Sequence, residues 1–122
     1  MKLTCAVLVL ASFSPAFGHH SFAADFDSSK PVSLTGTVTR VAWMNPHATL
    51  YVDVKDGNGK ITPWEFELAS PNALLRLGWT RNSLRPGEVV TIRGFRAKDG
   101  SAWANVESVT LSDRRSLIDL RR

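Results

Sequence analysis

The stretch from residue 48 to residue 68, ATLYVDVKDGNGKITPWEFEL, decides the fold because it encodes two alternating strands joined by a tight turn. Apolar and polar residues alternate through positions 48–55 and again through 61–68, which predicts strands that each bury one face. The turn DGNG between them contains Gly and Asn, which accept positive φ and favour a hairpin. Pro63 cannot donate to a ladder, so it predicts a sheet edge or a bulge. The expected inward residues are Ala48, Leu50, Val52, Val54, Trp64, Phe66 and Leu68.

The segment before the hairpin, VSLTGTVTRVAW at 32–43, predicts a long first strand because it is rich in β-branched residues. Its apolar residues change parity partway along, from Val32, Leu34 and Val38 to Val41 and Trp43. A bulge or bend near Gly36 or Arg40 would reconcile the two halves.

The segment after the hairpin changes to a helical pattern. In SPNALLRLG, Ser70 is a candidate N-cap, Pro71 suits the first helical position, and Gly78 ends the helix. Two more strands follow at 89–97 and 103–111, joined by the turn KDGS. Val90 and Ile92 should share the core of the hairpin.

The order of three strands, a helix and two strands predicts an all-β protein with one short helix. We expect a small five-stranded, OB-like Greek-key barrel, with an open five-stranded sandwich as the alternative. The expected organisation is a signal peptide at 1–18, an arm at 19–31 that packs Phe22 and Phe26 on the domain, the barrel at 32–111, and a charged, frayed tail at 112–122.

The amino-terminal segment has the features of a cleavable leader. Lys2 precedes the apolar run CAVLVLASF, which is too short to span a bilayer. Small residues at Ala16 and Gly18 favour cleavage after Gly18, which would make His19 the first residue of the mature chain. Cleavage after Ala16 is an alternative, and cleavage after Ala23 or Ala24 would remove both amino-terminal histidines.

The composition narrows the function classes. The chain of 122 residues suits one small domain, and its single cysteine, Cys5, would leave with the leader, so no disulfide is expected. The formal net charge of +4 favours anionic partners only weakly. We expect a periplasmic or secreted protein without a membrane span and without a nucleic-acid partner.

Several motifs, taken in order, resemble a known family. HHSFAADFD, KPVSLTGTV, NPHA, SPNALLRLGWTR and RAKDGS are similar to segments of small secreted Gram-negative proteins classed as a domain of unknown function. The resemblance covers nearly the whole mature chain and implies a periplasmic setting. It implies no activity and no catalytic residue.

The three histidines of the chain provide a metal-binding hypothesis. A free amino terminus at His19 could chelate copper through its amine and ring Nδ1, and His47 could add a third nitrogen, a combination that copper(II) favours. His20 is a spare ligand. A second hypothesis pairs Met44 with His47 for copper(I), capped by Trp43. The same residues could instead be a solvated terminus, an ordinary NPH turn and a cover for the end of the barrel.

A binding surface of another class is the alternative. Trp43, Tyr51, Arg93 and Arg96 could form an aromatic and cationic face for a partner protein, an anionic polymer or a saccharide. Trp64, Trp79 and Trp103 are expected in the core. Glu65 and Glu67 have the alternation of an exposed face, and no nucleophile–histidine pair or phosphate loop is evident. We therefore expect a binding domain rather than an enzyme.

Overall fold

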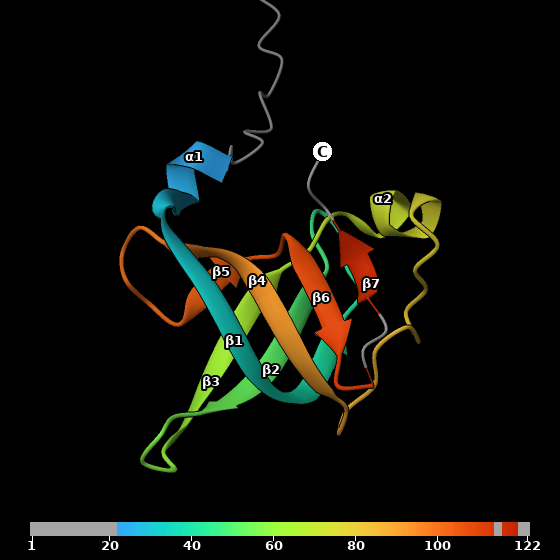
Figure 1. Ribbon diagram of the computed structural model, residues 1–122. Coiled ribbons are helices and arrows are strands. Elements are labelled where there is room, and N and C mark those ends of the chain that lie inside the picture. The colour runs from blue at the N-terminus through green and yellow to red at the C-terminus, as the bar shows by residue number, and fades with distance from the viewer. Residues whose placement is uncertain (1–21, 114–115, 120–122) are drawn as a thin grey trace, which may run out of the picture.

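The computed structural model describes residues 22–113 and 116–119, which form one sheet and two short helices (Figure 1). The elements are α1 (Phe22–Asp25), β1 (Phe26–Ala42), β2 (Thr49–Lys55), β3 (Ile61–Glu67), α2 (Pro71–Arg76), β4 (Val89–Ala97), β5 (Trp103–Asn105), β6 (Ser108–Leu111) and β7 (Ser116–Asp119). Within these residues, neither helix is long and apolar enough to cross a membrane.

Five strands close into a barrel in the order β1-β2-β3-β5-β4, with β4 pairing back onto β1 (Figure 1). The β3–β5 pair is parallel, and the other pairs in the ring are antiparallel. β6 and β7 extend the sheet beyond β4. This arrangement, with a helix between the third and fourth strands, confirms the predicted OB-like barrel. The alternative of an open sandwich is wrong, because the β1–β4 and β3–β5 pairings leave no open edge between the two halves.

The hairpin formed by β2 and β3 is in the predicted register, with Val52 opposite Trp64. Gly59 has a φ of +82°, and the Asp56 carboxylate accepts hydrogen bonds from two backbone N–H groups of the turn. The N–H of Glu65 donates to the carbonyl of Ala102 on the β5 side. Alternate residues of a strand point their N–H groups the same way, so an N–H at position 63 would point toward β5. The β5 pairing begins only at Glu65, so Pro63 interrupts no hydrogen bond between these strands.

The first strand is bent and begins earlier than expected. The β1–β2 register shifts between Val38 and Arg40, which confirms the predicted bulge. β1 starts at Phe26, inside the expected arm at 19–31, because Phe26 is only 3% exposed and pairs with Ala97 of β4. The boundary at residue 32 is therefore corrected to residue 26. The ring of Phe26 packs against that of Trp103, with 4.6 Å between the ring centroids, and this contact holds the start of β1.

The helix α2 and the core agree with the sequence pattern. The Ser70 hydroxyl accepts a hydrogen bond from the N–H of Ala73, and Gly78 follows the helix with a φ of +89°. The inward residues predicted on both sides of the barrel are buried, except that Val54 is only partly buried near the end of β2. The buried ones are Ala48, Leu50, Val52, Trp64, Phe66, Leu68, Val90 and Ile92.

The carboxyl-terminal part differs from the expectation in two ways. The single strand expected at 103–111 is split, because the N–H of Val106 donates to Glu67 of β3 whereas that of Glu107 donates to Arg93 of β4. The chain thus crosses between two partner strands at this point. The tail expected to fray from residue 112 contains β7, which pairs antiparallel with β6. Tertiary pairing stabilises a segment whose composition alone indicated a charged, solvated end.

Candidate functional site

His47 and Glu67 lie together because of the β2–β3 ladder. Just before β2, the N–H of Ala48 donates to Ala69, and the N–H of Leu68 donates back to Ala48. Ala48 and Leu68 are buried in the core, so the alternation of the strands turns the preceding residues, His47 and Glu67, outward on the same side. The loop before His47 contains a cis peptide bond at Asn45–Pro46.

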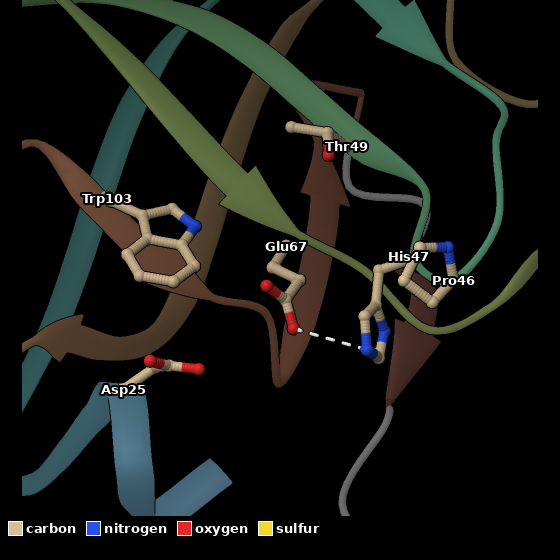
Figure 2. A pocket seen from close by; sticks show the side chains of 6 residues that line it. All are labelled: Asp25, Pro46, His47, Thr49, Glu67 and Trp103. Atoms are coloured by element: carbon tan, nitrogen blue, oxygen red, sulfur yellow. Dashed lines mark ion pairs between the residues drawn. The ribbon is translucent and has the colours of Figure 1, made fainter. Parts of the chain in front are cut away.

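The two side chains form an ion pair when His47 is protonated. The His47 Nε2 is 3.7 Å from the Glu67 Oε1, and the two side chains are 42% and 26% exposed (Figure 2). Both line an open pocket of about 330 Å³. Its lining residues are Asp25, Pro46, His47, Thr49, Glu67 and Trp103. The pocket therefore combines an imidazole, two carboxylates and an indole.

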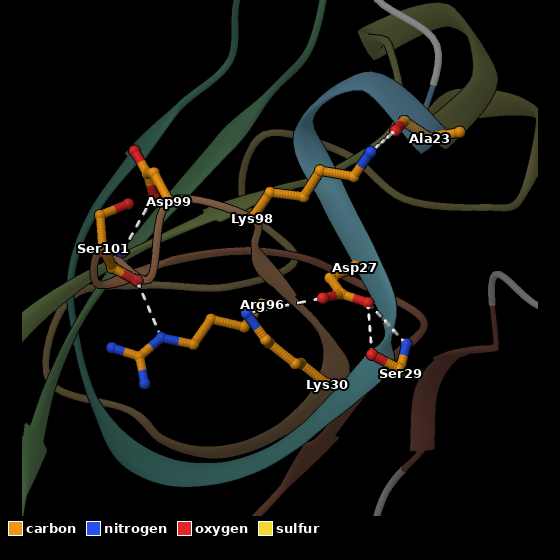
Figure 3. A network of polar contacts seen from close by, with 8 residues as sticks. All are labelled: Ala23, Asp27, Ser29, Lys30, Arg96, Lys98, Asp99 and Ser101. Carbon is orange, nitrogen blue, oxygen red and sulfur yellow. Dashed lines mark hydrogen bonds and ion pairs between the residues drawn. The ribbon is translucent and has the colours of Figure 1, made fainter.

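Asp25 reaches this pocket because α1 is attached to the end of β4. The N–H of Lys98 donates to the carbonyl of Asp25 at 2.9 Å, and the Lys98 ammonium donates to the carbonyl of Ala23 (Figure 3). The ring of Phe22 packs 5.7 Å from those of Phe26 and Phe95. Asp25 is consequently held at the start of the barrel beside Trp103 (Figure 2).

The turn after β4 is organised by its own polar side chains. The Asp99 carboxylate accepts a hydrogen bond from the N–H of Ser101 at 2.9 Å. Hydrogen bonds from the side chain and backbone of Ser101 lower the pKa of Asp99. The Arg96 guanidinium donates from Nε to the Ser101 carbonyl at 3.1 Å (Figure 3). It also donates to the Gly100 carbonyl. On its other side, Arg96 lies over the ring of Trp64, 5.2 Å from its centre. Arg96 thus connects the turn to the barrel.

A second carboxylate near the start of β1 is organised in the same way. Asp27 accepts hydrogen bonds from the N–H and hydroxyl of Ser29, at 2.9 and 2.6 Å, and pairs with Lys30 at 3.5 Å (Figure 3). The Ser29 hydrogen bonds are the main reason that the pKa of Asp27 is lowered. Asp27 and Asp99 are therefore ionised at neutral pH, and each carboxylate accepts from the backbone N–H of the serine two positions later.

The contacts of Arg96 predict that it stabilises the fold. We expect Arg96→Ala to lower the free energy of unfolding by about 1–2 kcal/mol, because charge-assisted hydrogen bonds and ring packing are lost. Arg93→Ala is the matched control on the same strand, and its exposed side chain should contribute less than about 0.5 kcal/mol. Urea unfolding of the two variants measures the difference. Equal unfolding midpoints would show that the Arg96 contacts contribute nothing.

The predicted metal ligands fall in different places. His19 and His20 lie outside the described residues. His47 lines the pocket, whereas Met44 is 63% exposed and does not line it. Trp43 packs partly buried against the core. In residues 22–113, no group of three or more His, Cys, Asp or Glu side chains is arranged to hold a metal ion. Among the described residues, His47 and Glu67 are potential donors that lie 3.7 Å apart.

The residues of the predicted partner face are dispersed. Tyr51 is covered by Arg40, whose guanidinium carbon lies 4.0 Å from the ring centre. Tyr51 pairs with Arg40 near the end of β1, whereas Arg93 pairs with Ser33 on its first half. Arg96 is engaged in the turn, and Trp43 packs against the core. The structure does not gather the four side chains into one face.

Sequence reasoning did not identify Glu67, Asp25 and Trp103 as members of one site with His47. The hairpin register carried a signal for Glu67, because the DGNG turn places Thr49 opposite Glu67 and so brings His47 near it. For Asp25 and Trp103 no local signal exists. The prediction that Trp103 lies in the core is wrong, because Trp103 is only partly buried and forms a wall of the pocket.

The closed five-stranded barrel and the pocket beside β3 and β5 define a small OB-fold domain. The chain belongs to a family of unknown function, DUF6152, whose model matches residues 6–106. This membership agrees with the resemblance found in the motifs. No curated protein matches the chain.

A solved structure supports the assignment of the fold. The mitochondrial single-stranded DNA-binding protein Rim1 of S. cerevisiae is similar over 75% of this chain and 99% of its own, with a TM-score of 0.51. The two sequences are 13% identical, so the likeness concerns the fold alone.

Proposed function

We propose that this protein is a small periplasmic binding domain that holds copper between its processed amino terminus and His47. The observation that carries the proposal is the pocket that His47 shares with Asp25. His19 precedes Asp25 by six residues, and Phe22–Asp25 form α1, so the connection spans at most about 15 Å. This short connection supports a site that the amino-terminal histidines share with His47.

The chemistry of the donors favours copper(II). The α-amine and ring Nδ1 of His19 with an imidazole nitrogen of His47 would supply three nitrogen donors, and copper(II) binds such tetragonal sites most tightly among first-row divalent ions. His20 would be a spare ligand. The copper(I) alternative with Met44 has less support, because Met44 does not line the pocket.

The proposal requires removal of the leader after Gly18. We propose that residues 1–18 direct the chain to the periplasm and that His19 becomes its first residue. An intact mass measured on protein purified from the periplasm identifies the first residue directly. A mature chain that begins after Ala23 or Ala24 would lack both histidines and would exclude this site.

The central test is a copper(II) titration of the mature protein. One extra residue before His19 converts the α-amine to an amide, and His47→Ala removes an imidazole. We expect each change to weaken binding by at least about 100-fold, because loss of even a supporting residue in a metal site costs roughly 10- to 100-fold. His20→Ala is the control and should have a much smaller effect.

The pH dependence provides a second readout of the same site. Neutral imidazole is the ligand, so protons should compete with copper for the same nitrogen atoms in acid. Affinity should therefore decrease from pH 7.5 to pH 5.5. If the extended protein and His47→Ala both bind copper as tightly as the mature chain, the proposed site is wrong.

A further inference from the structure

We infer that Glu67 is a metal ligand beside His47, so that the site is a mixed nitrogen and oxygen site rather than one made only of nitrogen. This inference rests on the proposed function. It goes further by assigning a donor that neither the histidine pattern nor the family description indicates. Its basis is the geometry of the His47–Glu67 pair in the pocket.

The two donor atoms are close enough to share one ion. The His47 Nε2 and the Glu67 Oε1 are 3.7 Å apart (Figure 2). Metal–nitrogen and metal–oxygen bonds are about 2.0–2.2 Å long, so donors at right angles on one ion stand about 3 Å apart. A closing movement of less than about 1 Å would bring both into contact with the metal. Neither side chain is fully buried, so side-chain rotation can provide this movement.

The position of the pair on the backbone is well defined. Thr49 is opposite Glu67 in the β2–β3 ladder, and Ala48 continues the pairing by accepting from the Leu68 N–H and donating to the Ala69 carbonyl. Glu67 is therefore held in β3, and His47 lies two positions before β2, next to the backbone pairing of Ala48. Backbone pairing beside both donors reduces the conformational freedom lost on binding, which favours a preorganised half-site.

Glu65 is the natural comparison within the same strand. It lies two positions before Glu67 and also points outward, but it lies opposite Tyr51 and lines another pocket with Pro63 and Ala102, which shares only Trp103 with the pocket of His47. A general effect of negative charge would involve Glu65 and Glu67 alike. Direct ligation should depend on Glu67 alone.

A carboxylate ligand also affects which oxidation state is preferred. Carboxylate oxygen suits harder cations, whereas copper(I) prefers thiolate and thioether ligands. With Glu67 as a donor, the site should favour copper(II) over copper(I). The exclusion of Met44 from the pocket lining agrees with this preference.

The test combines a copper(II) titration with electron paramagnetic resonance of the mature wild-type protein, E67Q, E65Q and H47A. We expect E67Q to bind copper(II) about 10- to 100-fold more weakly and to change the parallel g and hyperfine values, because an anionic oxygen donor is replaced by a neutral amide. E65Q should retain the wild-type affinity and spectrum. H47A should lose one nitrogen coupling.

The outcomes test the role of Glu67 separately from copper binding itself. A wild-type spectrum and affinity for E67Q, with weak binding by H47A, would leave the copper site in place and overturn the assignment of Glu67. Weaker binding by E67Q with an unchanged spectrum would make Glu67 a positioning residue, which also overturns ligation. If the wild-type protein binds no copper, the proposed function itself fails. Circular dichroism confirms folding, and Glu67→Thr replaces E67Q if the latter does not fold.

Discussion

Gly94→Ala is expected to destabilise the barrel by about 3 kcal/mol or more, at the upper end of the range for overpacking. A Cβ added at Gly94 would lie 1.8 Å from the carbonyl oxygen of Asn105 and 2.9 Å from its carbonyl carbon. Both are backbone atoms, so no side-chain rotation relieves the overlap. β4 and the chain at Asn105 must separate, which also disrupts the hydrogen bond of 2.7 Å from the Phe95 N–H to the Asn105 side chain.

Thermal unfolding measures this effect. For a domain of this size, a loss of about 3 kcal/mol corresponds to a fall in Tm of more than about 10 °C. Gly57→Ala is the control, because a Cβ at Gly57 would meet no atom within 4 Å and its φ is not in the left-handed region. It should change stability by less than about 0.5 kcal/mol. Similar melting of the two variants would contradict the close approach of Asn105 to β4.

The Gly94 variant should also affect the site. Trp103 lies in β5 two positions before Asn105 and forms a wall of the pocket. Separation of β4 from this part of the chain should displace Trp103, and its fluorescence should change in the folded protein. The closure of the barrel and the shape of the pocket are therefore coupled through β5.

Val52→Asp is expected to cost several kcal/mol, because it places an unpaired carboxylate in the core. Val52 is 1% exposed and is paired with Val38 on one side and Trp64 on the other. A loss of this size approaches the whole stability of a small domain, about 5–15 kcal/mol. The variant should be largely unfolded at neutral pH by circular dichroism.

The pH dependence of this variant has a defined sign. Burial raises the pKa of a carboxyl group above its unfolded value, so the buried Asp becomes neutral as the pH falls and the penalty decreases. Val52→Asp should therefore recover stability, relative to wild type, in acid. Val89→Asp is the control, because Val89 is 40% exposed and its variant should remain folded at neutral pH. Equal melts for the two variants would mean that the inward face of β2 is wrongly assigned.

Metal binding and the stability of the barrel should depend on different residues of the chain. His47 and Glu67 are partly exposed and line a pocket, whereas Val52 is buried in the barrel and Gly94 lies against the backbone of Asn105. Substitution of the site residues should change metal binding with little change in melting. Substitution of the barrel residues should change both.

Local sequence determined much of the fold. The alternation around Val52 and Trp64, the DGNG turn and the Ser70 cap each depend on residues close together in the chain, so their patterns predict the hairpin and the helix directly. The bulge near Arg40 was also visible, because the apolar parity changes there. Among the site residues, His47 was identified by its residue type and its place in a turn.

Only the tertiary structure decided the closure of the barrel and the rest of the site. The start of β1 at Phe26, the division of residues 103–111 into β5 and β6, and the pairing of β7 depend on strands distant in sequence. The pocket likewise joins Asp25, His47, Glu67 and Trp103, which come from four separate segments. A periodic pattern specifies which face of a segment is buried, but not which other segment covers it. Long-range hydrogen bonds and packing select that partner, and here they bring a carboxylate beside the histidine.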